Sequence, residues 1–250
     1  MSKKIKLDSG YKVIEFEELD STMITLKELA VKDCNIKTVV CAKKQKRGRG
    51  RQGRSWVSPK GNLYYSFLRN PEDKNSKNMF APVFIVALTI VDTIKTISNN
   101  KIIPTIKWPN DILINRSKIA GILIENINLT GNKNLLNIGI GINIVSNPIN
   151  TLYPSTNLKK ENINTSYREV LQIFFDKLIL FEKIYISKGA NEIYKMWSIF
   201  AHKIGDPISV KIGGRKIFGT FNGLNEEGGL LLLNELGDIK VILAGDIFLL

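Results

Sequence analysis

The pattern of apolar residues changes character near Ile204. Before that point, apolar residues recur every three or four positions over 165–188, with Val170, Phe174 and Leu178 on one face, which is typical of a long amphipathic helix. After it, short apolar runs at 208–212, 216–221, 230–233, 240–243 and 247–249 are separated by glycine turns. Five short strands at such close spacing predict a small β-barrel of roughly SH3 size. The chain is therefore expected to be α+β up to residue 203 and all-β from residue 204.

The segment before Ile204 contains both strand and helix patterns. A polar segment at 20–22 offers N-cap chemistry for a helix that starts there. A hairpin is expected where two β-type runs, 112–115 and 119–125, flank an Asn-Arg-Ser turn. Gly139 and Gly141 interrupt a further strand, which indicates that a ligand or another backbone comes close. Strands are also expected at 12–16, 38–42, 62–68 and 135–144, helices at 79–97 and 191–200, a loop at 146–163, and a polar lead-in over residues 1–10.

Composition limits the class of protein more than it selects a function. With 250 residues, 44% of them hydrophobic, the chain can bury a substantial core, which excludes disordered, collagen-like and disulfide-stapled proteins. The 36 Lys and Arg against 23 Asp and Glu give a net charge of +13, which attracts phosphate without choosing among nucleic acid, nucleotide and acidic protein. Cys34 and Cys41 form no disulfide framework, and the longest apolar run, 79–91, is shorter than the ~20 residues of a membrane span. A cytoplasmic protein without membrane contact is expected.

Glycine alternates with arginine in the most distinctive segment, Arg47-Gly48-Arg49-Gly50-Arg51-Gln52-Gly53-Arg54-Ser55-Trp56. The glycines let backbone amides approach an anion, and each guanidinium can bind a phosphate through two hydrogen bonds. The segment is not a P-loop, because it lacks the Gly-Lys-Ser/Thr ending. By composition alone, a solvated or RNA-binding basic loop explains it as well as a nucleotide-binding loop does.

A second polar segment, Lys107-Trp108-Pro109-Asn110-Asp111, precedes the expected hairpin. Its proline constrains the backbone, and the amide and carboxylate that follow stand where a strand begins. Lys118 opens the second strand of the hairpin, where its ammonium could lie over a neighbouring pocket and hold a negative charge. Taken alone, Lys118 is explained more simply as a solvated lysine beside a surface turn.

Five motifs in order make the chain recognisable. They are Asp20-Ser21-Thr22, Gly48–Trp56, Lys107–Asp111, Lys118 with Gly121-Ile122-Leu123 and Glu125, and Gly139–Asn143. Through these motifs and the β-rich C-terminal segment, the chain resembles the biotin protein ligases, which are relatives of the lipoate ligases. The resemblance covers nearly the whole chain. It implies a mixed-sheet catalytic domain of the biotin/lipoate ligase type over 1–203, followed by an SH3-like domain over 204–250.

The resemblance implies a two-step reaction. Biotin and MgATP would form biotinyl-5′-AMP, and the biotinyl group would then pass to one lysine of a biotin carboxyl carrier protein, such as that of acetyl-CoA carboxylase. Lys118 matches the lysine that holds the biotin carboxylate and the α-phosphate, and Arg51 belongs to the loop that closes over both. These two residues are therefore expected to be catalytic, whereas no residue is assigned as a ligand of Mg²⁺.

The resemblance also divides residues between the two substrates. Met23 departs from the family pattern, because the family usually has Asn after the Ser-Thr pair, and this change weakens the polar capture of biotin. The expected biotin-binding residues are Ser21, Thr22, Gln45, Arg49, Gly50, Arg51, Lys118 and Gly121, and the expected ATP-binding residues are Arg51, Trp56, Asn110, Asp111, Lys118 and Asn143.

Two other functions compete with this one. A lipoate or octanoate ligase or transferase would share the fold and bind a different acid, although the full Gly-Arg run favours biotin. A nucleic-acid-binding protein would use the basic loop for phosphate contacts. Many biotin ligases carry an N-terminal winged helix, but Ser21 lies too near the start of this chain to leave room for one, so specific DNA binding is not expected. The resemblance leaves monomer and homodimer both open.

Overall fold

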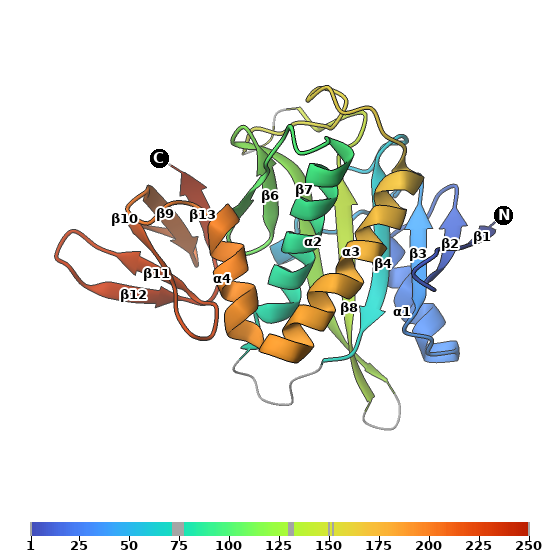
Figure 1. Cartoon of the computed structure of the whole chain (residues 1–250), viewed down its shortest axis with the longest axis horizontal. Helices are drawn as coiled ribbons and strands as arrows, with labels where there is room; N and C mark the ends of the chain where they lie inside the picture. Colours follow the sequence, from blue (N-terminus) through green and yellow to red (C-terminus); the bar gives the residue numbers. More distant parts are fainter. Residues whose placement is uncertain (1, 72–77, 130–132, 150, 152, 250) are drawn as a thin grey trace.

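The computed structural model describes residues 2–71, 78–129, 133–149, 151 and 153–249 of the chain. Its strands form two sheets that follow one another in sequence (Figure 1). The large sheet contains β1 (Ser2–Lys6), β2 (Lys12–Phe16), β3 (Thr38–Ala42), β4 (Leu63–Arg69), β5 (Thr105–Lys107), β6 (Asp111–Ile114), β7 (Ser117–Leu129) and β8 (Lys133–Ile142). The small sheet contains β9 (Pro207–Ile212), β10 (Arg215–Leu224), β11 (Leu230–Leu233), β12 (Ile239–Ile242) and β13 (Asp246–Leu249). The helices are α1 (Thr22–Lys32), α2 (Ala81–Ile97), α3 (Tyr167–Lys188) and α4 (Ala190–Phe200), with a 3₁₀ turn η1 (Arg51–Gly53).

The large sheet is mixed, as expected. Its strands lie in the order β1-β2-β3-β4-β8-β7-β6-β5. Strands β2 and β3 run parallel, whereas the other neighbouring pairs are antiparallel. Helix α1 connects the parallel pair, because parallel neighbours need a crossover rather than a tight turn. This crossover brings the start of α1 to the edge of the pocket described below.

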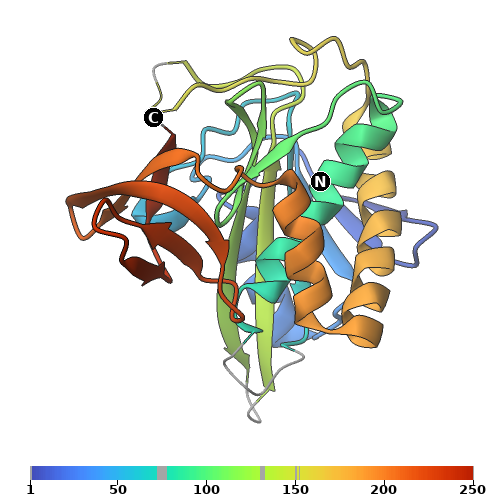
Figure 2. The same cartoon turned by 60° about the vertical axis from the view of Figure 1, so that its left-hand side comes forward.

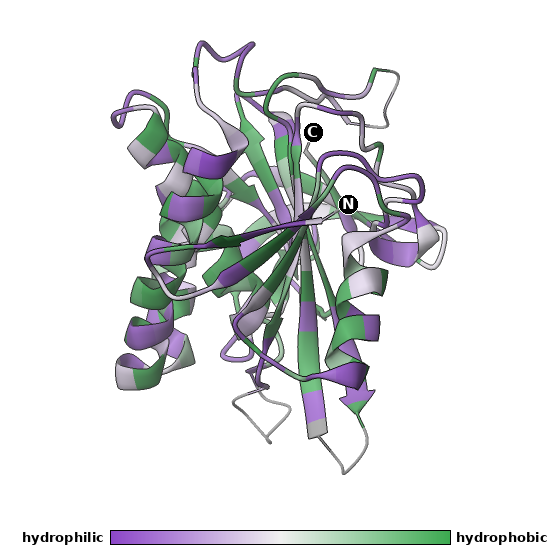
Figure 3. Cartoon of the chain, turned by 90° about the vertical axis from the view of Figure 1, so that its right-hand side faces the viewer, coloured by the Kyte–Doolittle hydropathy of each residue, from purple (hydrophilic) through white to green (hydrophobic). Residues whose placement is uncertain are grey.

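Helices cover both faces of the large sheet. Helices α2, α3 and α4 lie on one face (Figure 1), and α1 lies on the other, which is clear in the view along the sheet edge (Figure 3). Because successive side chains of a strand point to opposite faces, Val39 of β3 joins the core under α2 and α3, while Val40 joins a smaller core with Leu26 of α1. In the described part of the chain, no helix has both the length and the apolar character needed to span a membrane.

The hairpin expected between two β-type runs is confirmed as β6 and β7. Asn115 and Arg116 connect them with φ values of 49° and 61°, so both residues are left-handed. Two left-handed central residues form a type I′ turn, whose twist matches that of antiparallel strands. This turn places Lys118 on the strand that pairs with the strand of Asp111.

The small sheet confirms the five short strands but not the barrel. It is antiparallel, with the order β12-β11-β10-β9-β13, and Figure 2 shows it beside the β6–β7 hairpin and α4. A barrel closes only when its two edge strands pair. In the described chain no pairing joins β12 to β13, and three of the four residues of β12 are exposed. The small all-β C-terminal unit is therefore confirmed, and among the described residues its antiparallel sheet stays open between β12 and β13.

Two strands and one cap differ from the sequence predictions. The expected polar lead-in contains β1, which pairs with β2 at the edge of the large sheet and exposes most of its residues. An edge strand of this kind lacks an apolar alternation, and β5 contains only three residues, so neither produces a clear sequence signal. Ser21 occupies the N-cap position of α1, but its side chain makes no capping hydrogen bond.

Candidate active site

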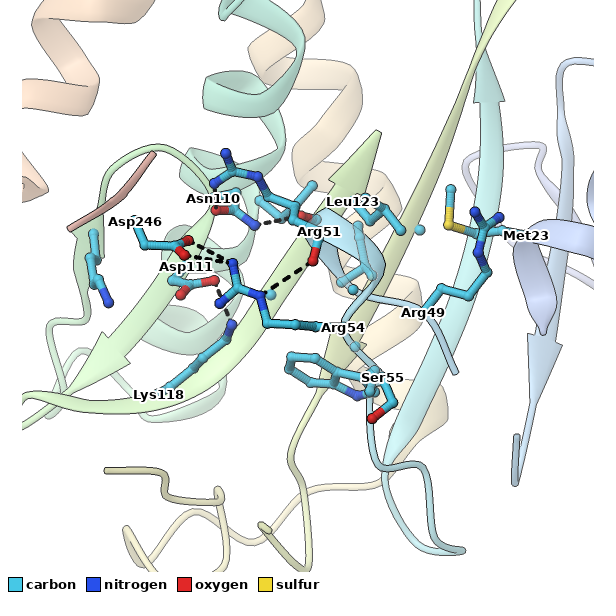
Figure 4. Close-up of a pocket in the computed structure, with 18 of the residues that line it drawn as sticks. Met23, Arg49, Arg51, Arg54, Ser55, Asn110, Asp111, Lys118, Leu123 and Asp246 are labelled. Carbon is cyan, nitrogen blue, oxygen red and sulfur yellow. Dashed lines mark hydrogen bonds and ion pairs between the residues drawn. The ribbon is translucent and has the colours of Figure 1, made fainter. Parts of the chain in front are cut away.

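A pocket lies on the α1 side of the large sheet, where segments far apart in sequence converge (Figure 4). Strands β7 and β8 contribute to its floor, and the start of α1, the Gly-Arg segment and the β6–β7 hairpin surround it. The start of β13, in the small sheet, completes the wall. The lining residues are Ser21, Thr22, Met23, Gln45, Arg49, Gly50, Arg51, Arg54, Ser55, Trp56, Lys107, Trp108, Asn110, Asp111, Lys118, Gly121, Ile122, Leu123, Gly139, Ile140, Gly141, Tyr153, Gly245, Asp246 and Ile247.

One part of the pocket is polar and uncharged. Thr22 donates to Gln45 Oε1 from its backbone N at 2.9 Å and from Oγ1 at 3.3 Å. Gln45 Nε2 donates to Ser58 Oγ at 3.0 Å, which orients the amide. Ser21 and Thr22 are buried. Within the described chain Ser21 Oγ makes no hydrogen bond and caps no helix, so this hydroxyl is available to a ligand.

The Trp56 ring lies directly on the backbone of the sheet. A Cβ added to Gly141 would stand 2.5 Å from Trp56 Nε1, and one added to Gly121 would stand 2.9 Å from Trp56 Cζ3. Any larger residue at these positions would displace the ring. Trp56 Nε1 is buried without a hydrogen-bond partner among the described residues, which leaves a donor for a ligand.

Met23 occupies the equivalent gap at Gly139. A Cβ on that glycine would stand 2.5 Å from Met23 Sδ, and Met23 is 4% exposed. The prediction that something approaches Gly139 and Gly141 closely is confirmed, and the approaching groups are the Met23 and Trp56 side chains. At the position where the family resemblance led us to expect Asn, a thioether forms an apolar wall next to Ser21 and Thr22.

Two arginines of the Gly-Arg segment bind carboxylates at opposite ends of the pocket. Arg49 Nη2 lies 2.7 Å from Glu125 Oε1. Arg54 Nη2 donates to both carboxylate oxygens of Asp246, at 2.7 and 2.8 Å. Figure 4 shows Arg49 on the Met23 side and Arg54 on the Asp246 side. The segment is thus joined to the large sheet at one end and to the small sheet at the other.

Arg51 is held differently, by an amide rather than a carboxylate. Its Nη1 donates to Asn110 Oδ1 at 2.9 Å, and Asn110 Nδ2 donates to the carbonyl of Ile122 at 2.8 Å. Burial lowers the pKa of the Arg51 guanidinium. A buried cation that lacks an anionic partner is costly, and an anionic ligand would relieve that cost.

Lys118 lies in the pocket and pairs with Asp111. Its Nζ stands 2.6 Å from Asp111 Oδ1 and 5.1 Å from the centre of the Trp56 ring. The Lys118 side chain is 25% exposed and that of Asp111 14% exposed. The simpler interpretation, a solvated lysine at a surface turn, is wrong, because the ammonium lines the pocket.

Of the expected site residues, Asn143 alone lies outside this lining as far as the structure describes the chain. It is buried, and its Nδ2 donates to the carbonyl of Thr156 at 3.0 Å, while Oδ1 has no partner among the described residues. It holds the strand end behind the pocket, and its assignment to ATP stays a prediction.

Several lining residues received no role in the site from the sequence, among them Lys107, Tyr153 and Asp246. Lys107 belongs to one of the five motifs but received no role, Tyr153 lies in a segment predicted to be a loop, and Asp246 lies in a predicted turn before the last strand. No local pattern could have identified Tyr153 or Asp246, because each reaches the pocket only through the packing of distant segments. The charge on Lys107, next to a proline-containing turn, is the one usable signal.

Comparisons with known proteins agree with this geometry. A model of the biotin/lipoate A/B protein ligase family matches residues 15–143, and a model of the biotin protein ligase C-terminal domain matches residues 203–250. The bifunctional ligase/repressor BirA of Escherichia coli is 28% identical over 83% of this chain, which spans 65% of the length of that relative. The biotin–[acetyl-CoA-carboxylase] ligase of Paracoccus denitrificans is 28% identical, with 84% of this chain and 89% of that protein covered.

A solved structure is similar over almost the full chain. The biotin protein ligase from Aquifex aeolicus in complex with biotin and ATP aligns with a TM-score of 0.80 and 32% identity, covering 95% of this chain and 98% of that one. Both domain models and the complete fold therefore agree, and the chain belongs to the biotin protein ligases of the biotin/lipoate A/B protein ligase family.

Proposed function

We propose that this protein activates biotin with ATP to form biotinyl-5′-AMP and transfers the biotinyl group to a lysine of a biotin carboxyl carrier protein. The observation that carries the proposal is a single pocket that combines an uncharged polar end, a glycine floor and a cluster of lysine and arginine side chains. A bicyclic urea with an apolar tail suits the first two features, and a nucleotide suits the third. The relatives named ligases support the same reaction.

The chemistry needs positive charge more than a proton acceptor. The carboxylate of biotin is ionised at neutral pH and can attack the α-phosphate directly, so this step requires no general base. Two anions must nevertheless approach one another, and cations placed beforehand at that point lower the barrier. We assign this role to Lys118, held by Asp111, and to Arg51, held by Asn110.

The remaining assignments follow the pocket from end to end. Ser21, Thr22 and Gln45 are proposed to bind the urea ring, and Gly121 would line the pocket through its backbone. Trp56, on the glycine floor, would cover the adenylate and exclude water, which protects a mixed anhydride from hydrolysis. Arg49 and Gly50 are proposed to act with Arg51 in closing the loop, and Asn143 keeps its proposed ATP role from behind the pocket.

Magnesium does not fit this site as a resident metal. Within the described chain no group of three or more His, Cys, Asp or Glu residues could hold a metal ion, and both pocket carboxylates, Asp111 and Asp246, are paired with cations. Mg²⁺ is therefore proposed to accompany the ATP phosphates, as is usual for nucleotide-binding proteins. No step above is assigned to it.

The function can be tested with purified protein. Incubation with biotin, ATP and a carrier domain should add one biotinyl group to the carrier, measured by mass spectrometry. Pyrophosphate release should depend on biotin and should be much slower with lipoate or octanoate. Faster release with either of those acids would make the protein a lipoate or octanoate enzyme of the same fold.

Arg51 provides a prediction about retention of the intermediate. Arg51→Ala is expected to release biotinyl-AMP about 10- to 100-fold faster, because it removes a charge-assisted contact to the phosphate. Released adenylate should then biotinylate lysines of added albumin, detected by streptavidin blot. Arg47→Ala is the matched control, because Arg47 is in the same segment but its side chain is 78% exposed and paired with Asp20 outside the pocket lining. Equal adenylate retention by the two variants would contradict the role of Arg51.

We also make proposals about the acceptor protein, the cellular location and the domain boundary. We assign the acetyl-CoA carboxylase carrier, or a related one, as the acceptor, and leave the choice between monomer and homodimer to a sedimentation measurement. Cys34 and Cys41 are both free thiols, which suits a reducing compartment, so we propose a cytoplasmic location. The catalytic and C-terminal domains are proposed to meet between residues 203 and 204.

Specific DNA binding is not expected despite the net charge of +13. Arg49 and Arg54 already bind carboxylates within the chain. Any DNA binding should therefore be weak, sensitive to salt and independent of sequence. A gel-shift titration at physiological salt, with biotin and ATP present, compares promoter DNA of biotin-synthesis genes with scrambled DNA. A complex with promoter DNA that survives competitor DNA would contradict this prediction.

A further inference from the structure

Lys107 is a buried cation in the pocket that the reaction above does not use. It is the last residue of β5 and is 6% exposed. Its Nζ lies 3.4 Å from the centre of the Tyr153 ring. Among the described residues, no carboxylate lies within ion-pair distance of Lys107 Nζ and no acceptor hydrogen-bonds to it. A lysine is rarely buried without a partner, so its surroundings require a specific explanation.

The other cations of the pocket differ in whether a carboxylate of the chain neutralises them. Arg49, Arg54 and Lys118 each pair with a carboxylate of this chain. Arg51 and Lys107 line the same pocket and have no carboxylate within ion-pair distance in the part of the chain that the structure describes. A buried lysine and a half-buried arginine that face one pocket without counter-charges favour a ligand with at least two negative charges.

Tyr153 positions Lys107. It lies in the segment 146–163, for which the sequence predicted a loop and no role in the site. Its ring contacts both the Lys107 ammonium and the ring of Phe248 in β13, with 5.1 Å between the two ring centres. An ammonium over an aromatic face is attracted to it, and more strongly when water is excluded. The small sheet therefore supports the lysine through Tyr153, while its Asp246 binds Arg54 beside it.

We propose that Lys107 binds the terminal phosphates of ATP, with Tyr153 as the residue that positions it. This inference rests on the proposed adenylation reaction and adds a residue to it. Lys118 and Arg51 are already placed at the carboxylate and the α-phosphate. Lys107, a further cation of the same pocket at the β5–β6 edge, suits the part of ATP that leaves as pyrophosphate.

The lowered pKa of Lys107 agrees with this arrangement. Burial is the main cause that lowers its pKa, to about 8, with nearby Lys118 and Arg54 acting in the same direction and Asp111 and Asp246 acting against it. Burial raises the pKa of Tyr153 to about 12, and burial lowers that of nearby His202, so neither competes near pH 8.5. The lowered pKa of Lys107 thus leaves a substantial neutral fraction in the free enzyme at pH 8.5. Phosphate binding favours the ammonium form, so ATP binding should take up a proton there.

The experiment measures this proton by calorimetry of MgATP binding at pH 8.5, without biotin, in two buffers of different ionisation enthalpy. The wild-type protein should take up a measurable fraction of a proton per ATP, because a pKa of about 8 leaves part of the Lys107 population neutral at this pH. AMP, which lacks the terminal phosphates, should cause little uptake. Lys107→Arg keeps the charge at all pH values, so it should bind ATP without proton uptake. Lys107→Met should also lose the uptake and bind ATP about 10- to 100-fold more weakly.

Two further variants separate positioning from general damage to the fold. Tyr153→Leu admits water to the ammonium, so the lysine should already be charged at pH 8.5 and the proton uptake should fall. Lys95→Met is the matched control, because Lys95 lies over the Phe200 ring at 5.5 Å outside the pocket lining, and it should behave as wild type.

Three results would overturn the proposal: wild-type proton uptake in both Lys107 variants, equal uptake with AMP, or unchanged uptake in Tyr153→Leu. Each can be recognised in a protein that still forms biotinyl-AMP. A wild-type protein that forms no adenylate would instead contradict the proposed function itself.

Discussion

Replacing Lys118 with alanine is expected to reduce biotinyl-AMP formation on the order of 10²- to 10³-fold, the range typical for removal of a preorganised charge-stabilising group. The structure explains why the loss should be large. Lys118 Nζ is held 2.6 Å from Asp111 and beside the Trp56 ring, so the ammonium is in position before the substrates arrive. Biotin-dependent pyrophosphate release measures the effect.

The control for this prediction must remove an equivalent ion pair elsewhere. Lys177 and Asp92 form one at 2.9 Å between α3 and α2, with similar partial exposure. Lys177→Ala should therefore have a comparable effect on thermal unfolding and leave pyrophosphate release near wild type. The double variant Lys118→Ala/Asp111→Asn removes the stranded carboxylate and should remain inactive. Near-normal release by Lys118→Ala, or recovery in the double variant, would show that Lys118 acts only through its ion pair.

Gly141→Ala is expected to be the next most damaging change, although it adds a single methyl group. The new Cβ would stand 2.5 Å from Trp56 Nε1, so the ring must leave the floor of β8. Trp56 is tied to the Gly-Arg segment, because its backbone N donates to the carbonyl of Gly48 at 2.9 Å. Displacement of about 1 Å at such a site can cost about 10²-fold in rate, and overpacking should cost about 1–3 kcal/mol of stability. Pyrophosphate release and thermal unfolding measure the two effects.

Gly139→Ala is the matched control on the same strand and face. Its Cβ would meet Met23, whose flexible side chain can adopt another rotamer, so the loss should be smaller. Adding Trp56→Ala to Gly141→Ala should cause little further loss, because both changes remove the same ring contact. Equal effects of the two alanine substitutions, or additive effects of the Gly141 and Trp56 changes, would contradict this account.

Predictions from sequence succeeded where the signal was local. The Asn-Arg turn between β6 and β7 and the long α3 helix each follow from a few adjacent residues. The same reasoning failed for β1, an edge strand without apolar alternation, and for closure of the C-terminal barrel, which depends on whether two distant edge strands meet. Local patterns indicate the strands that alternate apolar and polar residues, but they do not determine which edges pair.

The site residues also fall into those that the sequence could identify and those that only the structure reveals. The Gly-Arg segment and Lys118 could be selected from the sequence because they combine unusual residue types at short spacing, and the structure brings them into one pocket. For Met23, in contrast, the sequence predicts only a weaker polar capture of biotin. Its side chain lies across Gly139 of β8, more than a hundred residues away in the chain, and only this contact makes it a wall of the pocket.

By itself, the sequence determined the two-part organisation of the chain, most of its helices and strands, and the residue types able to bind an acid and a nucleotide. Only the tertiary structure decided which cations are neutralised within the chain and which remain for a ligand. Arg54 is paired because β13 brings Asp246 beside it, whereas Lys107 is buried against Tyr153 without a carboxylate partner in the described chain. The physical reason is that charge in a buried site depends on distances between segments that are remote in sequence, and packing alone sets those distances.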